Sequence, residues 1–170
     1  MENTTNDEHS EMEKKSEWVK VEHGFLKIGH KPGGKKLSFE QLIEEDTTTI
    51  FTILGEKEGA LNIGKTCSDW GLGWIWLPLS NAGIPDETLI PEITDKLEIV
   101  KTKLDNREKI YVHCSAGLHR TGMITNCILR YVGFDEAHAY QIIQQLRPIT
   151  AKEVGQPRLD FGSRFYGGAV

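Results

Sequence analysis

Cysteine is scarce in this sequence, with Cys67, Cys114 and Cys127 among 170 residues. An odd and sparse set of cysteines does not fit the disulfide framework of a small secreted protein. No apolar run approaches the ~18 residues that a membrane-spanning helix needs, and the N-terminal residues lack the pattern of a secretory signal peptide. We therefore expect no membrane span and a reducing compartment, the cytoplasm.

Positive charge is also in short supply. The sequence has 20 lysines and arginines against 25 aspartates and glutamates, which gives a formal net charge of −5. Because neutralising phosphates requires a basic surface, we do not expect nucleic acid as a partner. The basic residues still gather in two groups, which either flank an active site and attract anionic substrates or form an ordinary solvated surface. These groups are Lys27, His30, Lys31, Lys35 and Lys36, and Arg147, Lys152, Arg158 and Arg164.

The length of the chain suits a single domain. Residues 1–17 are polar, acid-rich and nearly devoid of apolar side chains, which predicts a disordered acidic leader. Residues 18–166 are expected to form the folded domain, and residues 167–170 a flexible tail. The sequence contains no internal repeat and no sign of a second domain, and we expect a monomer.

Strand-like and helix-like patterns alternate through the folded domain, which predicts an α/β fold with a central, mostly parallel sheet flanked by helices. The predicted strands lie at 18–28, 48–54, 74–77 and 109–112. The predicted helices begin after Ser38, span 56–67 and 89–104, and follow Arg120, Asp135 and Thr150. Ser38 and Thr150 are each followed three residues later by Gln or Glu, the pattern of a capping box.

The segment HCSAGLHRTG, residues 113–122, carries the densest group of reactive side chains and lies between a predicted strand and a predicted helix. The five residues between Cys114 and Arg120 can close a loop around a tetrahedral anion, with backbone N–H groups pointing inward. Arg120 adds a planar fork of donors for two phosphate oxygens. The same positive field favours a thiolate at Cys114, which is an activated nucleophile. A strand-turn-helix with an incidental cysteine is the alternative.

This segment resembles the active-site loop of the cysteine-dependent protein tyrosine phosphatase superfamily, HC-x5-R-[ST], and the chain is similar to its small, atypical dual-specificity group from about residue 24 to residue 165. The resemblance implies that Cys114 attacks phosphorus to form a phosphocysteine while Arg120 binds the equatorial oxygens. It further implies that Thr121 hydrogen-bonds Cys114 and that His113 orients the loop from behind. No metal or organic cofactor is implied. The loop residues expected to bind substrate are Ser115, Ala116, Gly117, Leu118, His119 and Arg120, although His119 could instead point to solvent.

One position departs from the family pattern. Relatives usually place an aspartic general acid a few residues after a proline, whereas the matching segment here has Ser80 and Asn81. An amide cannot donate a proton as a carboxylic acid does. Asp86, five residues after Asn81 on the same predicted loop, is the candidate acid. It could equally be a helix N-cap, because it follows Pro85 and precedes a helical pattern.

Two more residues are candidates through the resemblance. Gln156 has about the location of a family glutamine that lies near the attacking water, although an exposed helical glutamine is equally compatible with the sequence. Some members protect the nucleophile through a disulfide to a second cysteine. Cys67 is a candidate partner of Cys114, because Cys67 precedes a strand expected to neighbour the strand before Cys114.

These observations lead to a phosphomonoesterase that acts on phosphotyrosine, and also on phosphoserine or phosphothreonine, in phosphorylated proteins. The loop contains no lysine, whereas phosphoinositide-directed relatives often have one or more there. Phosphatases of inositol phosphates, phosphoinositides or RNA 5′ phosphates share the chemistry and remain open. An alternative of another class is a catalytically weak, phosphate-binding pseudophosphatase, which the amide at Asn81 suggests.

Overall fold

The computed structural model describes residues 15–168, so the predicted leader up to residue 14 and the last two residues of the predicted tail lie outside the described residues. The described chain forms one five-stranded sheet with the order β1-β2-β5-β3-β4. The strands are β1 (Val19–Val21), β2 (Gly24–Gly29), β3 (Thr49–Thr52), β4 (Gly73–Trp76) and β5 (Lys109–His113). Only β1 runs antiparallel to its neighbour, which confirms the predicted mostly parallel sheet.

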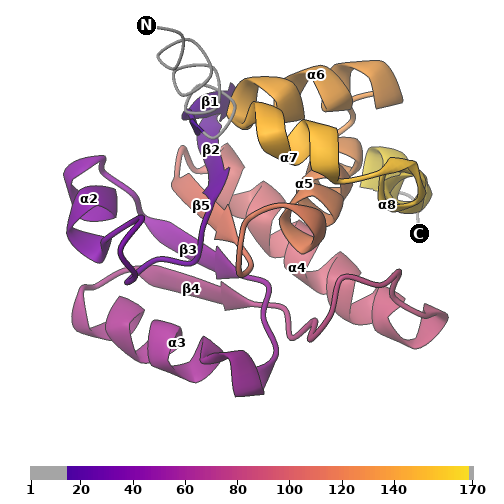
Figure 1. The fold of residues 1–170 in the computed structure, drawn as a ribbon. Helices are drawn as coiled ribbons and strands as arrows, with labels where there is room; N and C mark the ends of the chain where they lie inside the picture. Colours follow the sequence, from indigo (N-terminus) through magenta and orange to yellow (C-terminus); the bar gives the residue numbers. More distant parts are fainter. Residues whose placement is uncertain (1–14, 169–170) are drawn as a thin grey trace, which may run out of the picture.

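Helices cover the sheet and form the α/β fold that the sequence predicts (Figure 1). The α4, α5 and α6 helices contact strands from the β1-β2-β5 part of the sheet, and α3 contacts β3 and β4. The α-helices are α2 (Phe39–Glu44), α3 (Ala60–Asp69), α4 (Ile90–Asp105), α5 (His119–Tyr131), α6 (Glu136–Leu146), α7 (Pro148–Glu153) and α8 (Gln156–Phe161). The 3-10 helices are η1 (Glu56–Glu58), η2 (Glu87–Leu89) and η3 (Gly162–Gly168). No described helix is both long and apolar enough to cross a membrane.

The register of the parallel strands brings three loops together. His113 at the end of β5 pairs with Gly29 at the end of β2 and with Thr52 at the end of β3. The segments that follow these strands therefore leave the sheet at one edge, the usual place for ligands in open parallel sheets. Cys114 is the first residue after β5 and lies at the centre of this edge.

The α5 helix is the most enclosed helix of the described chain, with every residue from Arg120 to Arg130 buried. Its apolar side chains, including the fully buried Met123 and Cys127, pack into the core as the helical spacing predicts. This packing fixes the helix against the sheet. As a result, the loop between β5 and α5 is anchored firmly at both ends.

The helix predicted over 56–67 is divided in the structure. Gly59 has a φ of 88°, a left-handed conformation that favours glycine, and it ends η1 before α3 begins. This break matters for the site, because it turns Glu58 out of the α3 surface and toward the loop after β5.

The capping box predicted at Thr150 is wrong. The α7 helix already begins at Pro148, a favoured first helical residue, so Thr150 lies inside the helix. Its hydroxyl is buried and donates to Gly117 O at 2.6 Å.

At the amino end of the described chain, Glu17 N–H donates to Leu146 O at 2.9 Å, so ordered backbone begins slightly before the predicted start at Trp18.

Candidate active site

The loop between β5 and α5 turns its carbonyl groups outward. Each of five consecutive carbonyl oxygens, from Cys114 to Leu118, accepts a hydrogen bond: the first four from groups behind the loop, and Leu118 O from the first turn of α5. The contacts are His113 Nδ1 with Cys114 O at 2.8 Å, Lys31 N with Ser115 O at 3.1 Å, Arg147 with Ala116 O at 2.9 Å and Gly117 O at 3.0 Å, Thr150 with Gly117 O at 2.6 Å, and Gly122 N with Leu118 O at 3.0 Å.

The amide groups of this loop are left for a ligand. Within residues 15–168, no protein atom accepts a hydrogen bond from the amides of residues 115–118. With the carbonyls held outward, successive N–H groups form a concave donor surface of the kind that binds anions. The amino end of α5 adds its dipole to the same side. We call this loop, residues 114–120, the cradle.

Glycine is required at one position of the cradle. Gly117 has a φ of 71°, and a Cβ built there would lie 2.2 Å from Gly29 O at the end of β2. No other residue could adopt this backbone without pushing the loop off the sheet.

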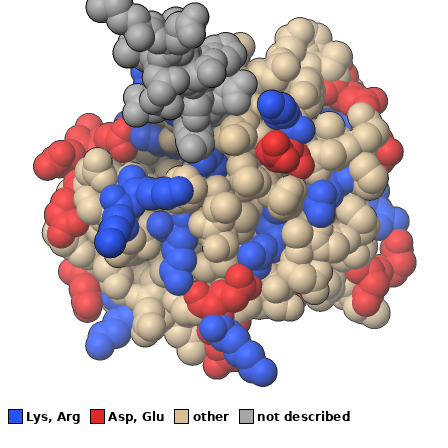
Figure 2. Space-filling model, in the orientation of Figure 1, with Lys and Arg blue, Asp and Glu red and all other residues tan. Residues whose placement is uncertain are grey.

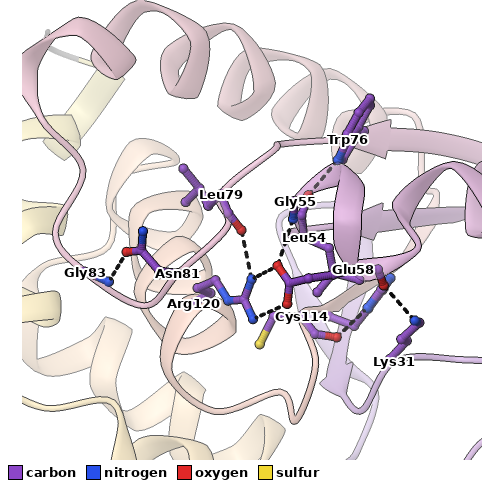
Figure 3. A network of polar contacts seen from close by, with 11 residues as sticks. Lys31, Leu54, Gly55, Glu58, Trp76, Leu79, Asn81, Gly83, Cys114 and Arg120 are labelled. Carbon is purple, nitrogen blue, oxygen red and sulfur yellow. Dashed lines mark hydrogen bonds and ion pairs between the residues drawn. The ribbon is translucent and has the colours of Figure 1, made fainter.

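Arg120 is held by two partners in the loops that follow β3 and β4 (Figure 3). Its Nη1 and Nη2 donate to the two carboxylate oxygens of Glu58 at 2.7 and 3.0 Å, and Nη1 also donates to Leu79 O at 2.8 Å. These contacts use three of the five guanidinium N–H donors. The Nε–H and the second Nη2–H share one edge of the planar group, which leaves a two-donor fork for phosphate oxygens.

The Cys114 sulfur lies next to the Arg120 guanidinium (Figure 3). Cys114 is only 4% exposed, at the base of the cradle. The hydrogen bond with Glu58 and, less strongly, the charge of Cys114 hold the pKa of Arg120 above its usual value, against the effect of burial. The permanently charged guanidinium therefore supplies the positive field that an ionised sulfur needs.

Glu58 is a site residue that the sequence analysis did not identify. It is 62 residues from Arg120 in the chain, and no local motif marks it. The hydrogen bond from Arg120 is the main cause that lowers the pKa of its carboxyl, and a bond from Gly55 N at 3.0 Å fixes its rotamer. Glu58 thus acts on the cradle as a positioning residue, by orienting the guanidinium.

His113 joins the cradle to the sheet through a chain of hydrogen bonds. Its Nδ1 faces Cys114 O at 2.8 Å, so this nitrogen must carry the proton, and its Nε2 then accepts from Thr52 Oγ1 at 2.8 Å. Trp74 Nε1 donates to the same Thr52 oxygen at 2.9 Å. This arrangement supports the expectation that His113 orients the loop from behind.

Burial of His113 should make the stability of the fold depend on pH. Desolvation lowers the pKa of its imidazole to about 4 from the ordinary 6.5. The unfolded chain takes up a proton at His113 below pH 6.5 and the folded chain does not, so this contribution to stability is complete above 6.5 and is lost as pH falls toward 4. The integrated loss is about 3 kcal/mol. Urea unfolding between pH 7 and 4 should show this slope in the wild type and a smaller slope in His113→Asn, which cannot titrate. If the free energy of unfolding fell equally with pH in the wild type and in His113→Asn, His113 would not be the group responsible.

The hydrogen bond expected from Thr121 to Cys114 is not formed. The Thr121 hydroxyl is buried and has no hydrogen-bond partner among the described residues. A helical threonine often bonds the carbonyl four residues earlier, but that carbonyl, Gly117 O, already accepts from Arg147 and Thr150. The hydroxyl is therefore an unused donor beside the cradle.

Asp86 has the alternative role that the sequence left open. It is the N-cap of η2, where its carboxylate accepts from Thr88 N at 2.8 Å and from the Thr88 hydroxyl. The hydroxyl bond is the main cause that holds the pKa of this exposed carboxyl below its usual value. A general acid needs the opposite shift, because it must carry a proton near neutral pH.

The side chain of Asn81 also forms a hydrogen bond within its own loop. Its Oδ1 accepts from Gly83 N at 2.8 Å, in the exposed segment that follows β4 (Figure 3). The backbone of this segment is held at Leu79 O by Arg120 and at Ala82 O by Arg158 at 2.8 Å. The segment is therefore docked against the site, but it brings no carboxyl group to Cys114 in this arrangement.

The pairing of Cys67 with Cys114 does not hold in this structure. The strand after Cys67 is β4, which pairs with β3 at the edge of the sheet and not with β5. Cys67 is buried in the last turn of α3, and both Cys67 and Cys114 are free thiols. Burial also raises the pKa of the Cys67 thiol to about 11.

Gln156 is the first residue of α8, and its side chain hydrogen-bonds carboxylates of α8 and α6. Its amide donates to Asp160 at 2.8 Å and to Glu136 at 3.3 Å. These contacts hold it toward α6, so the role near an attacking water stays a prediction that this conformation does not support.

The remaining loop residues form the rim of the cradle. Ser115 and Ala116 are exposed, and Leu118 and His119 are half-buried where α5 begins. Behind them, Arg147 is buried and bonds two loop carbonyls, a role that its sequence context as part of a basic group did not reveal. Arg147 and Thr150 are the side chains that fix the outward direction of the carbonyls.

The sequence matches the family described as "Dual specificity phosphatase, catalytic domain" over residues 58–158. It is 28% identical over 137 residues to cyclin-dependent kinase inhibitor 3 of Sus scrofa, which covers 74% of this chain and 63% of that protein. The chain thus spans less than two thirds of the length of this relative.

The fold is similar to solved phosphatase structures. The crystal structure of kinase associated phosphatase, with its catalytic-site cysteine replaced by serine, aligns with a TM-score of 0.72 at 20% identity and covers 89% of this chain and 93% of its own. PTPMT1 in complex with PI(5)P aligns with a TM-score of 0.62 at 17% identity, over 87% and 93% of the two chains. At this identity the likeness concerns the fold. The family match, in contrast, covers more than half of the chain and includes the whole cradle, and the chain belongs to the dual specificity phosphatase family.

Proposed function

We propose that this protein hydrolyses phosphate monoesters of phosphorylated proteins, phosphotyrosine first, through a phosphocysteine at Cys114. The observation that carries the proposal is the cradle itself: outward carbonyls and inward amides surround a sulfur that lies beside a guanidinium. The relationship to cyclin-dependent kinase inhibitor 3 and the absence of lysine from residues 114–119 favour a protein substrate.

The chemistry follows from these groups. The Cys114 thiolate attacks phosphorus in line with the ester bond; an S–P bond forms, the P–O bond breaks, and the leaving oxygen takes a proton from solvent water. Loop amides and the free edge of Arg120 stabilise charge on the equatorial oxygens. A water molecule then attacks the phosphocysteine, which releases inorganic phosphate and restores the thiolate. Because Glu58 already orients the Arg120 guanidinium, the substrate does not have to order this side chain when it binds.

A panel of substrates tests this proposal. We expect release of phosphate from phosphotyrosine peptides, and a phosphate adduct on Cys114 when turnover of an aryl phosphate is quenched in acid and the protein is analysed by mass spectrometry. Soluble inositol phosphates, phosphoinositide vesicles and RNA with a 5′ phosphate form the other arms. A higher kcat/KM for one of these than for every phosphopeptide would replace the proposed substrate class. Binding of phosphopeptide without any adduct or turnover would instead establish a phosphate-binding pseudophosphatase, the alternative that the capped Asp86 favours.

The capped state of Asp86 leads to a prediction about the leaving group. We expect Asp86→Asn to change kcat for p-nitrophenyl phosphate by less than about threefold and to leave the basic limb of the pH profile in place, since an acid that stays ionised donates no proton. Substrates with poorer leaving groups should be slow in the wild type for the same reason. Loss of the basic limb in Asp86→Asn, together with a fall of about tenfold or more, would restore Asp86 as the acid.

A further inference from the structure

A hollow of about 510 Å³ lies between α5, α6, α7 and α8, and no residue of the cradle lines it. The short α7 helix separates the two sites. From one face of α7, Thr150 donates to Gly117 O of the cradle, whereas Ala151 and Lys152 line the hollow from the other face. We call this space the helical hollow; the residues used below that line it are Asn126, Glu136, Ala137, Tyr140, Gln156 and Leu159.

The walls of the helical hollow are mostly apolar, and two hydrogen bonds hold them in place. The Tyr140 hydroxyl donates to Ala151 O at 3.2 Å, which joins α6 to α7. Asn126 Nδ2 donates to Leu159 O at 2.9 Å, which joins α5 to α8. A ligand would therefore enter a space that already exists, without first ordering the helices around it. The volume lies in the range of sites for small organic molecules.

Asn126 places a hydrogen-bond acceptor at the bottom of the helical hollow. The residue lies in the enclosed α5 helix and is only 2% exposed. Because its Nδ2 is bound to Leu159 O, its Oδ1 is the free branch of the amide, and no group within residues 15–168 donates to it. A buried amide oxygen without a donor costs free energy, which a ligand with an N–H group would recover.

The mouth of the helical hollow is acidic. Gln156 Nε2 donates to Glu136 at 3.3 Å and to Asp160 at 2.8 Å, so two carboxylates lie close to one amide group. Neither carboxylate forms an ion pair with another part of the described chain. Figure 2 shows acidic side chains at the edge of the molecule where α6 begins. The exposed Lys152 is the single basic residue that lines the hollow, so negative charge prevails at its mouth.

We propose that the helical hollow binds a small aromatic ammonium compound, an arylalkylamine with an N–H group on its ring system. The ring N–H would donate to Asn126 Oδ1 at the bottom, and the ammonium group would lie at the mouth beside Glu136. The flat apolar body would pack against Tyr140 and Leu159. Four helices border the hollow, and its volume suits a free molecule of this kind. This site is separate from the hydrolysis proposed at the cradle.

Tryptamine is a suitable probe, because it combines an indole N–H with an ammonium group. In an NMR titration of the full chain we expect a Kd on the order of 1 mM, with shift changes at the residues that line the hollow. Saturation of the cradle with inorganic phosphate should leave this Kd unchanged. The analogue methylated on the indole nitrogen should bind about fivefold more weakly, because it cannot donate to Asn126. Indolepropionate, which has a carboxylate in place of the ammonium group, should bind about tenfold more weakly or not at all.

Two substitutions at the edge of the hollow test its location, each with a matched control. Ala137→Phe places a ring in the hollow and should abolish tryptamine binding, whereas Gln145→Phe adds the same ring at an exposed position of α6 outside it. Glu136→Gln should weaken tryptamine binding by about threefold. Glu40→Gln should leave it unchanged, because Glu40 is also exposed in the first turn of a helix but lies on α2.

Each part of the inference has an outcome that would overturn it. Tryptamine binding that persists in Ala137→Phe, or shift changes that miss the residues of the hollow, would overturn the site. Equal affinity for indolepropionate would overturn the ammonium group as the feature recognised. Displacement of tryptamine by inorganic phosphate would place the probe in the cradle instead. Tighter binding of a peptide that begins with tryptophan than of tryptamine would overturn a free small molecule as the ligand.

Discussion

Replacing Cys114 by serine is expected to lower kcat/KM for p-nitrophenyl phosphate by about 10⁴-fold or more. The cradle holds the sulfur beside Arg120 and gives it the positive field that an ionised nucleophile needs. A serine hydroxyl at the same place stays protonated near neutral pH and has no base within the described site to remove its proton. Steady-state kinetics with a phosphotyrosine peptide and an aryl phosphate measure the effect.

Binding should survive this substitution. The loop amides and Arg120 do not depend on the sulfur for their positions, because His113, Arg147 and Thr150 hold the loop from behind. We therefore expect Cys114→Ser to bind phosphopeptide with an affinity close to that of the wild type in calorimetric titration. Cys67→Ala is the matched control, and it should keep its activity because Cys67 is a core residue of α3 and not part of the cradle. Activity of Cys114→Ser within tenfold of the wild type would remove the nucleophile from the proposal.

Replacing Arg120 by lysine is expected to cost about 10³-fold in kcat/KM, although the charge is kept. The guanidinium binds both oxygens of Glu58 and Leu79 O while it presents its free edge to the cradle. A lysine has three donors at one point and cannot serve Glu58, Leu79 and two phosphate oxygens together. The loss should fall mainly on kcat, because the charge that develops in the transition state needs the fork.

Glu58→Gln separates orientation from direct contact. The amide keeps the shape of Glu58 but gives the guanidinium only one acceptor oxygen, so we expect a loss of about tenfold, smaller than that of Arg120→Lys. Arg164→Lys is the matched control, since Arg164 pairs with Glu87 at 2.7 Å on the exposed surface, and it should change the rate by less than about twofold.

Retention of activity within tenfold in Arg120→Lys would show that a point charge at this position is sufficient. The argument that the two-donor fork of the guanidinium is needed would then be wrong.

The local elements of the fold follow the sequence closely. The strand before Cys114, the buried helix after Arg120 and the capping box at Ser38 all appear as predicted. Each depends on side-chain spacing over a few residues, which a single sequence displays directly. The exceptions have local causes as well: Gly59 divides one predicted helix, and Pro148 starts α7 before the expected cap at Thr150.

The candidate site was predicted only in part. The motif identified the cradle and its two principal groups, Cys114 and Arg120, because their chemistry depends on spacing within one loop. It did not identify Glu58, Arg147 or Thr150, which reach the loop from 30 to 62 residues away in the chain. The pairing expected for Cys67 did not hold, because it depended on the strand order, and the hydrogen bond expected from Thr121 to Cys114 is not formed in this conformation.

The sequence by itself determined that a cysteine and an arginine share one anion-binding loop between a strand and a helix. Only the tertiary structure decided which groups lie behind and beside that loop: a carboxylate that binds the arginine, and side chains that turn the carbonyls outward. The physical reason is range. Backbone propensity and motif spacing act over a few residues, whereas these contacts exist only because parallel strands distant in the chain end at the same edge of one sheet.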